Sequence, residues 1–143
     1  MILVDSSVLV RLADLGDPDH EIAIGAIERL LRREVTLYVT LQNLCEAWRV
    51  MTGQKTRNGL AFPISVADTE LGRLERLFAL LSEDTPAVTT EWRRLIVQHR
   101  VVDIDVFDAR LAATVIVHKL EAILTFDTGF ARYGVNVLDP ATV

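Results

Sequence analysis

The most constraining feature of this sequence is its start, which reads MILVDSS over residues 1–7. Three consecutive apolar residues predict a short strand that is buried on both faces. Ser6 and Ser7 can begin a helix, whose apolar positions continue on helical spacing from Val8. Asp5 therefore stands at the carboxyl end of a buried strand, which is the edge where ligands bind in open α/β sheets. The alternative role for Asp5 is to cap that helix.

The rest of the chain alternates predicted strands with predicted helices. This alternation indicates an α/β fold, with a parallel sheet, helices on both faces and a helical insertion between the second and third strands. Residues 52–65 are the least regular stretch. We expect strands at 2–4, 35–39, 87–88, 122–125 and 135–138, helices at 8–12, 18–33, 41–51, 66–81, 90–100 and 105–119, and a helical turn at 127–133.

Four carboxylates fall at equivalent points of successive strand-to-helix units. Asp5 ends the first strand, Glu46 lies about two turns into the helix after the second, Asp108 lies in the first turn of a later helix, and Asp127 follows the strand that ends at Thr125. Strand ends and the following helix starts share one rim of a parallel sheet. We therefore expect these four side chains to converge.

Each later acid also has a purely structural interpretation. Glu46 can be an ordinary exposed helix residue, Asp108 can be a first-turn acid favoured by the helix dipole opposite a cap at Asp105, and Asp127 can cap a short turn. If the four acids share a cleft, however, they repel one another strongly, and a divalent cation relieves that repulsion. Ligands that are all oxygen favour Mg²⁺ or Mn²⁺, and this chemistry suits phosphodiester hydrolysis.

Composition narrows the class of protein. The 143 residues suffice for one domain with its own core, so we treat 1–143 as a single domain. The net charge of −5 argues against broad electrostatic binding of nucleic acid, unless part of the excess acid holds metal ions. Cys45 is the only cysteine, and we expect it in the core of a cytoplasmic protein. We expect neither a membrane span nor a secretory leader.

Four segments of the chain resemble the PIN-domain ribonucleases, in particular the VapC toxins of bacterial toxin–antitoxin pairs. The segments contain the four acids, occur in the family's order and span essentially the whole chain. They read VDSSVL at 4–9, LCEA at 44–47, FDARLAA at 107–113 and LTFDTGFARY at 124–133.

The resemblance implies a three-layer α/β/α sandwich around a central, mostly parallel sheet of four or five strands. It implies a Mg²⁺- or Mn²⁺-dependent endoribonuclease that cleaves structured RNA such as tRNA or ribosomal RNA. It further implies a homodimer and a cognate VapB-like antitoxin, whose tail lies across the active-site cleft. On this comparison Asp5 and Asp108 hold the catalytic ion, and Asp127 and Glu46 complete the site directly or through water.

The chain departs from the family pattern near two of the acids. Ser7 stands where Asn is common, although its hydroxyl can still hydrogen-bond a water at the ion. Phe107 stands where His often precedes the acid, and Asp103 replaces a common Gly. Asp105 lies three residues before Asp108 and is a candidate to support the ligands or compete with them.

Several residues that flank the acids are candidates for contacts with an RNA substrate. Arg11, Arg110 and Arg132 lie beside the acid motifs, and Thr125 precedes Asp127 closely. Contacts from such cations to phosphate position a substrate without reading its sequence. The alternative is that they are solvated surface charges or members of salt bridges. Lys55 and Arg57 in the irregular stretch are weaker candidates of the same kind.

Other functions remain open at this point. The chain can be a catalytically silent binding module that acts only through its protein partner. A response-regulator phosphotransfer protein is disfavoured because no Lys follows Thr125, and a haloacid-dehalogenase-type phosphatase is disfavoured because Ser7 replaces the second acid that it needs. We also expect exposed apolar surface at Leu9, Leu12 and Leu15, where a dimer partner or an antitoxin can bind.

Overall fold

The computed structural model describes residues 1–143 and contains one sheet of five strands, all of them parallel. The strands lie in the spatial order β3-β2-β1-β4-β5, so β1 occupies the centre of the sheet. The α/β fold expected from the sequence is confirmed, and the sheet is wholly rather than mostly parallel. The strands are β1 (Ile2–Val4), β2 (Leu37–Val39), β3 (Ala79–Leu80), β4 (Ala122–Leu124) and β5 (Val137–Leu138).

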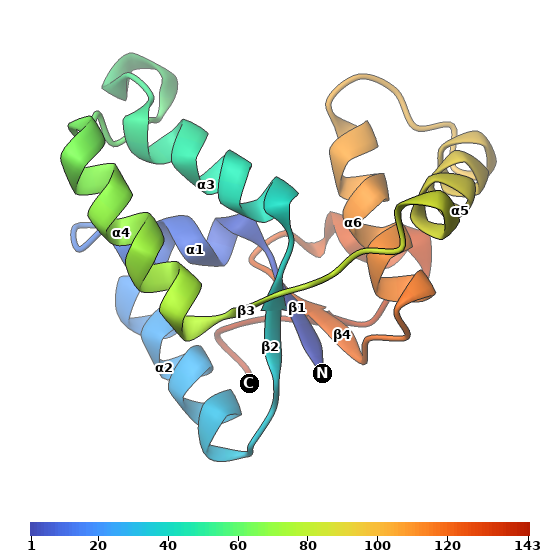
Figure 1. Ribbon diagram of the computed structural model, residues 1–143, viewed down its shortest axis with the longest axis horizontal. Coiled ribbons are helices and arrows are strands. Elements are labelled where there is room, and N and C mark those ends of the chain that lie inside the picture. The colour runs from blue at the N-terminus through green and yellow to red at the C-terminus, as the bar shows by residue number, and fades with distance from the viewer.

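Helices cover both faces of the sheet and complete a three-layer sandwich (Figure 1). None of them combines the length and the apolar character that a membrane span requires. The first layer holds α1 (Ser6–Ala13), α2 (His20–Arg32), α3 (Leu41–Thr52) and α4 (Ile64–Leu77). The second holds α5 (Thr85–Gln98), α6 (Asp105–Val117) and the 3-10 helix η2 (Thr128–Tyr133), while the 3-10 helix η1 (Lys55–Arg57) follows α3.

Alternation along β1 divides the hydrophobic core into two clusters. Ile2 and Val4 belong to the cluster beneath α1–α4, and Leu3 belongs to the cluster beneath α5 and α6. All three side chains are at most 4% exposed. The continuous apolar run is thus explained by a strand that is covered on both faces, as parallel strands generally are.

Capping residues set where two of the helices begin. The hydroxyl of Thr40 accepts a hydrogen bond from the backbone N–H of Asn43, and the amide oxygen of Asn43 accepts from the N–H of Thr40 at 2.9 Å, which forms a capping box at α3. Asp84 accepts from the N–H of Ala87, and Pro86 occupies the first turn of α5. Residues 87–88 are therefore helical, and the strand predicted there was wrong.

The third strand lies earlier in the chain than the sequence indicated. The helix predicted over 66–81 ends at Leu77, and β3 follows at Ala79–Leu80. The apolar spacing misled the prediction because Phe78 is buried while the two residues of β3 are exposed on an edge strand.

The apolar face of α3 differs by part of a turn from the one we expected. Leu44, Ala47 and Met51 are buried, whereas Leu41 and Cys45 are exposed. The expectation that Cys45 belongs to the core was wrong.

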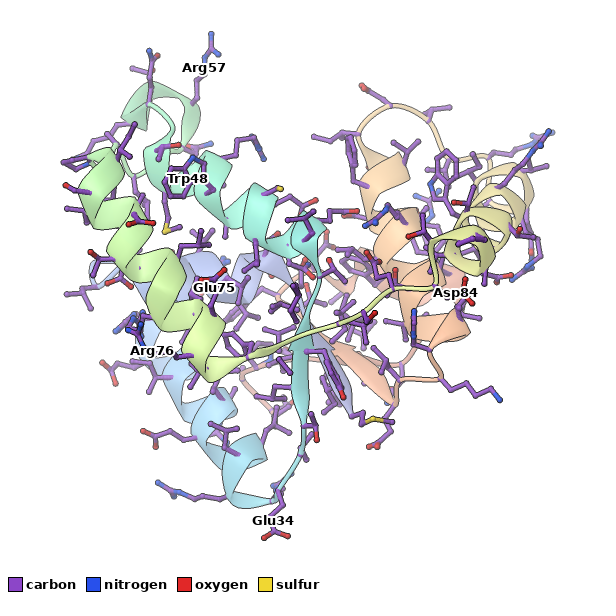
Figure 2. The ribbon with its side chains drawn as sticks, viewed as in Figure 1. Glu34, Trp48, Arg57, Glu75, Arg76 and Asp84 are labelled. Atoms are coloured by element: carbon purple, nitrogen blue, oxygen red, sulfur yellow. The ribbon has the colours of Figure 1, made fainter.

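The irregular stretch after α3 is bound to that helix by its own backbone. The N–H groups of Leu60 and Phe62 donate to the carbonyls of Val50 and Met51 at 2.9 and 2.8 Å. Gly59 lies so close to the backbone of Gly53 that any Cβ at position 59 would clash with it. The stretch is thus a compact loop, and Arg57 projects from its tip away from the rest of the molecule (Figure 2).

The structure separates the three leucines that we expected on the surface. Leu9 and Leu12 are 0% and 3% exposed and belong to the core, whereas Leu15 is 83% exposed. The expectation of an exposed apolar surface there was therefore wrong for Leu9 and Leu12.

This difference predicts opposite outcomes for two otherwise identical substitutions. Leu9→Ala removes fully buried atoms and leaves a cavity, so it should lower the free energy of unfolding by about 2–5 kcal/mol. Leu15→Ala removes a side chain that lies in water and should change it by no more than about 0.5 kcal/mol. Urea denaturation followed by circular dichroism measures both, and equal losses would contradict the assignment of Leu9 to the core.

Candidate active site at the carboxyl edge of the sheet

A cleft of about 590 Å³ opens at the carboxyl edge of the sheet. Its walls come from α3 and α6, which rise from opposite faces of the sheet (Figure 1). Three of the four predicted acids line it, and Asp5 lies next to it through Ser6. The lining residues are Ser6, Gln42, Cys45, Glu46, Arg49, Val50, Ile104, Asp105, Phe107, Asp108 and Asp127.

Asp5 directly follows β1 and is only 5% exposed. Its Oδ2 accepts hydrogen bonds from the hydroxyls of Ser7 at 2.7 Å and Thr125 at 2.8 Å, and from the backbone N–H of Ser7. Its Oδ1 has only the hydroxyl of Ser6, at 3.4 Å. Asp5 is therefore the cap of α1 and also keeps one oxygen with capacity for another partner at the cleft.

Glu46 is held in place by one donor on each of its carboxylate oxygens. The hydroxyl of Ser6 donates to Oε2 at 2.8 Å, and Nε2 of Gln42 donates to Oε1 at 2.8 Å. The same Gln42 donates to the carbonyl of Phe107 at 2.9 Å and accepts from Arg110 at 2.9 Å. Gln42 thus joins α3 to α6 across the cleft while it orients Glu46.

Asp108 is the most strongly perturbed acid of the molecule. Its carboxylate is partly buried and accepts no hydrogen bond from the rest of the chain. Burial, together with the negative charges of Asp5, Asp127, Glu46 and Asp105, raises the pKa of Asp108 from 3.8 to about 7. The four acids predicted from the sequence therefore do interact electrostatically at this edge of the sheet.

Asp127 and Asp105 also line the cleft. Oδ1 of Asp127 accepts from the N–H of Gly129 at 2.7 Å and caps η2, so its predicted capping role is correct. Asp105 is the first residue of α6 and lies 3.4 Å from Arg132. The N-cap of α6 is Ile104, which makes no side-chain cap, so the cap predicted at Asp105 was wrong.

The arginines singled out beside the acid motifs do not line the cleft. Arg11 lies 3.3 Å from Asp19, and its guanidinium covers the ring of Phe126 at 4.2 Å. Arg110 pairs with Glu83 at 2.9 Å and also donates to Gln42. Arg132 lies 3.4 Å from Asp105, so all three cations are already paired with acids of this chain.

Apart from Glu46, sequence reasoning assigned no role in the cleft to the residues of α3. Gln42 and Arg49 stand four residues before and three residues after Glu46, so all three share one face of the helix. That spacing was readable in the sequence. Ser6 was treated only as a capping residue, although its hydroxyl links Asp5 to Glu46.

The donor set of the cleft fits a hard divalent cation, although the acids do not form a complete cage. No three His, Cys, Asp or Glu side chains lie close enough to hold one ion between them. The available ligands are carboxylate and hydroxyl oxygens, which Mg²⁺ and Mn²⁺ prefer. Asp108, which has no donor and is surrounded by like charges, is the group that such a cation would stabilise most.

Comparison with known proteins adds the family context. The model of the PIN domain family matches residues 2–136. No curated protein matches the chain in sequence.

Three solved structures illustrate the similarity of the fold. VapC20 of Mycobacterium tuberculosis, a sarcin-ricin loop cleaving toxin, superposes with a TM-score of 0.69 at 21% identity, over 94% of this chain and 96% of that one. FitAcB of Neisseria gonorrhoeae gives 0.69 at 22% identity, over 100% of both chains. VapBC2 of Rickettsia felis, solved with a fragment of its promoter DNA, gives 0.71 at 14% identity, over 96% and 98%.

The raised pKa of Asp108 predicts that its charged carboxylate lowers the stability of the folded chain. Because its pKa is about 7 in the folded chain and near 3.8 when unfolded, the folded chain binds this proton more tightly. Stability should therefore fall as pH rises from about 4 to about 7, by about 1–2 kcal/mol for a partly exposed group. In chelator at pH 8, Asp108→Asn should then raise the free energy of unfolding by that amount.

The control is Asp68→Asn, which removes an exposed acid of α4 that forms no ion pair. Urea denaturation at pH 4.5 and pH 8 should show no comparable gain for that variant. If the free energies of unfolding of the wild type and of Asp108→Asn depended on pH in the same way, the shifted pKa of Asp108 would be contradicted.

The hydroxyl donors around Asp5 lead to a second expectation. Thr125→Val keeps the shape of the side chain but removes the donor to Asp5 and the acceptor of the Asp127 N–H. We expect the free energy of unfolding to fall by about 1–3 kcal/mol, since buried polar groups lose their partners. Thr89→Val, at an exposed position of α5, is the matched control and should stay within about 0.5 kcal/mol.

Proposed function

Because this chain belongs to the PIN domain family, we propose that it is a metal-dependent endoribonuclease and the toxin of a toxin–antitoxin pair. PIN domains are typically nucleases, and the solved neighbours VapC20, FitAcB and VapBC2 come from toxin–antitoxin systems. The RNA substrate, the metal and the partner are proposals, and the chemistry of the cleft supplies the support for them.

The observation that carries the proposal is the electrostatic state of Asp108. An isolated half-buried acid with no hydrogen-bond donor is unfavourable, and the charges of Asp5, Glu46 and Asp127 make it more so. A group of acids kept in a cleft at this cost is typical of functional sites. A divalent cation bound among them would offset the repulsion.

Mg²⁺ or Mn²⁺ would be held by Asp5 and Asp108, with Asp127 and Glu46 completing the site directly or through water. When bound, such an ion polarises a phosphodiester and lowers the pKa of water to make it a nucleophile. Asp108 accepts no hydrogen bond and Oδ1 of Asp5 accepts only a long one from Ser6, so both have capacity for a further partner, which supports their choice as ligands.

Neighbouring side chains of this chain position the acids rather than react. Ser7 and Thr125 fix Oδ2 of Asp5, so that Oδ1 faces a defined direction. Ser6 and Gln42 fix the two oxygens of Glu46. Such outer hydrogen bonds set the orientation of ligands and typically change metal affinity or activity by 10- to 100-fold when they are removed.

We further propose that the substrate is structured RNA, such as tRNA or ribosomal RNA. VapC20, which has the same fold, is a toxin that cleaves the sarcin-ricin loop. A net charge of −5 suits an enzyme whose contacts with RNA are local and confined to one cleft. We also propose that the chain forms a homodimer and that a VapB-like antitoxin inhibits it, since FitAcB and VapBC2 are neighbours from paired systems.

A catalytically silent binding module is the second candidate. The observation that favours it is that no three acids are close enough to ligate one ion together. Such a module would bind its partner without cleaving RNA under any metal.

Cleavage of total cellular RNA by the antitoxin-free protein separates the two candidates. With Mg²⁺ or Mn²⁺ we expect discrete fragments, and with chelator we expect none. Asp5→Asn and Asp108→Asn should each lower the cleavage rate by more than about a hundredfold, because a direct ligand matters more than its outer partners. Glu46→Gln should lower it by about 10- to 100-fold.

The matched control is Glu75→Gln, on α4 in the layer opposite α6 (Figure 2). Glu75 is exposed and lies outside the cleft, so its variant should cleave at the wild-type rate. Undiminished cleavage by both Asp variants would reject the proposed ligands. No cleavage by folded protein with either metal would favour the silent module.

A further inference from the structure

We propose that the cleft binds an unpaired nucleotide between Arg49 of α3 and Phe107 of α6, with Arg49 on a phosphate and Phe107 stacked on a base. The inference rests on the proposed ribonuclease function and assigns two residues of this chain to contacts with the bound strand. Neither residue belongs to the proposed metal site.

Arg49 is the only cation that lines a cleft otherwise rich in acids. It is exposed, and its guanidinium takes part in no ion pair or hydrogen bond of the chain. Arg11 and Arg110 differ in this respect, since each is paired with an acid of its own. A free guanidinium presents a planar fork of donors that matches phosphate oxygens, so Arg49 is suited to a phosphate of the bound strand.

Phe107 is an aromatic residue that the fold leaves in water. Its side chain is 52% exposed and lines the cleft next to Asp108. The ring makes no aromatic or cation–π contact within the chain, unlike Phe126 and Tyr133. Its position is nevertheless fixed, because Gln42 of the opposite wall donates to its backbone carbonyl at 2.9 Å.

The two residues face a shared space of suitable size. The cleft of about 590 Å³ lies within the range of sites that hold one small-molecule ligand, and a nucleotide is of that scale. Arg49 and Glu46 share one face of α3, and Phe107 directly precedes Asp108. The proposed phosphate contact and the proposed base contact therefore both lie beside the acids. A strand held by them would place its backbone near the proposed metal ligands.

The stacking partner determines the class of substrate. A base offers its face to an aromatic ring only when it is unpaired and splayed out, as in single-stranded loops, bulges and ends. A base inside an RNA duplex is stacked on its neighbours and does not reach Phe107. The contact with Phe107 therefore requires that the bound base is unpaired.

The test measures binding of a fluorescein-labelled, single-stranded 12-nucleotide RNA of mixed sequence by anisotropy in Mg²⁺. All proteins carry Asp108→Asn, so that the RNA is not cut. Phe107→Ala should weaken binding about tenfold, within the range for loss of one stacked base, and should leave the salt dependence unchanged. Arg49→Gln should also weaken binding and lower the slope of log affinity against log salt by about 0.7.

Matched variants separate these contacts from general effects. Phe107→Trp should keep the affinity, because it keeps an aromatic face. Val97→Ala and Arg93→Gln change an exposed apolar residue and an exposed cation of α5, both outside the cleft, and both variants should bind like the parent. When the RNA is annealed to its complement, the loss caused by Phe107→Ala should disappear.

The outcomes distinguish this inference from the proposed function. If the wild type cleaves RNA but Phe107→Ala and Arg49→Gln bind the single strand as the parent does, the inference is wrong and the ribonuclease stands. If the wild type cleaves nothing yet both variants lose affinity as described, the nucleotide site stands and the ribonuclease is wrong. Equal loss of single-strand and duplex binding by Phe107→Ala also overturns the inference.

Discussion

Strand β1 is three residues long and covered on both faces, so the rest of the molecule is assembled around it. Its centre position in the sheet places Asp5 between the ends of β2 and β4. Thr125 directly follows β4, and its hydroxyl donates to Asp5. Glu46 lies on the helix after β2, and the hydroxyl of Ser6 lies between it and Asp5. One short strand therefore fixes the place where parts of the chain 40 and 120 residues apart in sequence come together.

The same arrangement concentrates negative charge at one edge of the sheet. The chain distributes donors unevenly over these acids: Asp5 and Glu46 receive several hydrogen bonds, whereas Asp108 receives none and has a pKa near 7. A fold optimised for stability alone would place an amide or an apolar residue at that position. The repulsion at Asp108 supports the proposal that a cation binds among these acids.

The sequence allowed the central strand and the rim position of the four acids to be predicted, because each depends on local pattern and on topology. It did not place β3, since the apolar spacing that leads into Phe78 continues smoothly from α4. The exposure of Cys45 depends on how α3 is rotated over the core, which its own residues do not specify. The free state of Arg49 and the paired state of Arg110 depend on neighbours distant in sequence, such as Glu83.

The division of the core by the sheet has an evolutionary consequence. Leu3 packs with one helical layer, Ile2 and Val4 pack with the other, and the two clusters share no buried residue. Substitutions in different helical layers that lie more than about 7–10 Å apart should therefore have energetic effects that add. Each layer can thus change in sequence independently of the other. Such independence offers a physical reason why chains with as little as 14% identity keep this fold along nearly their whole length.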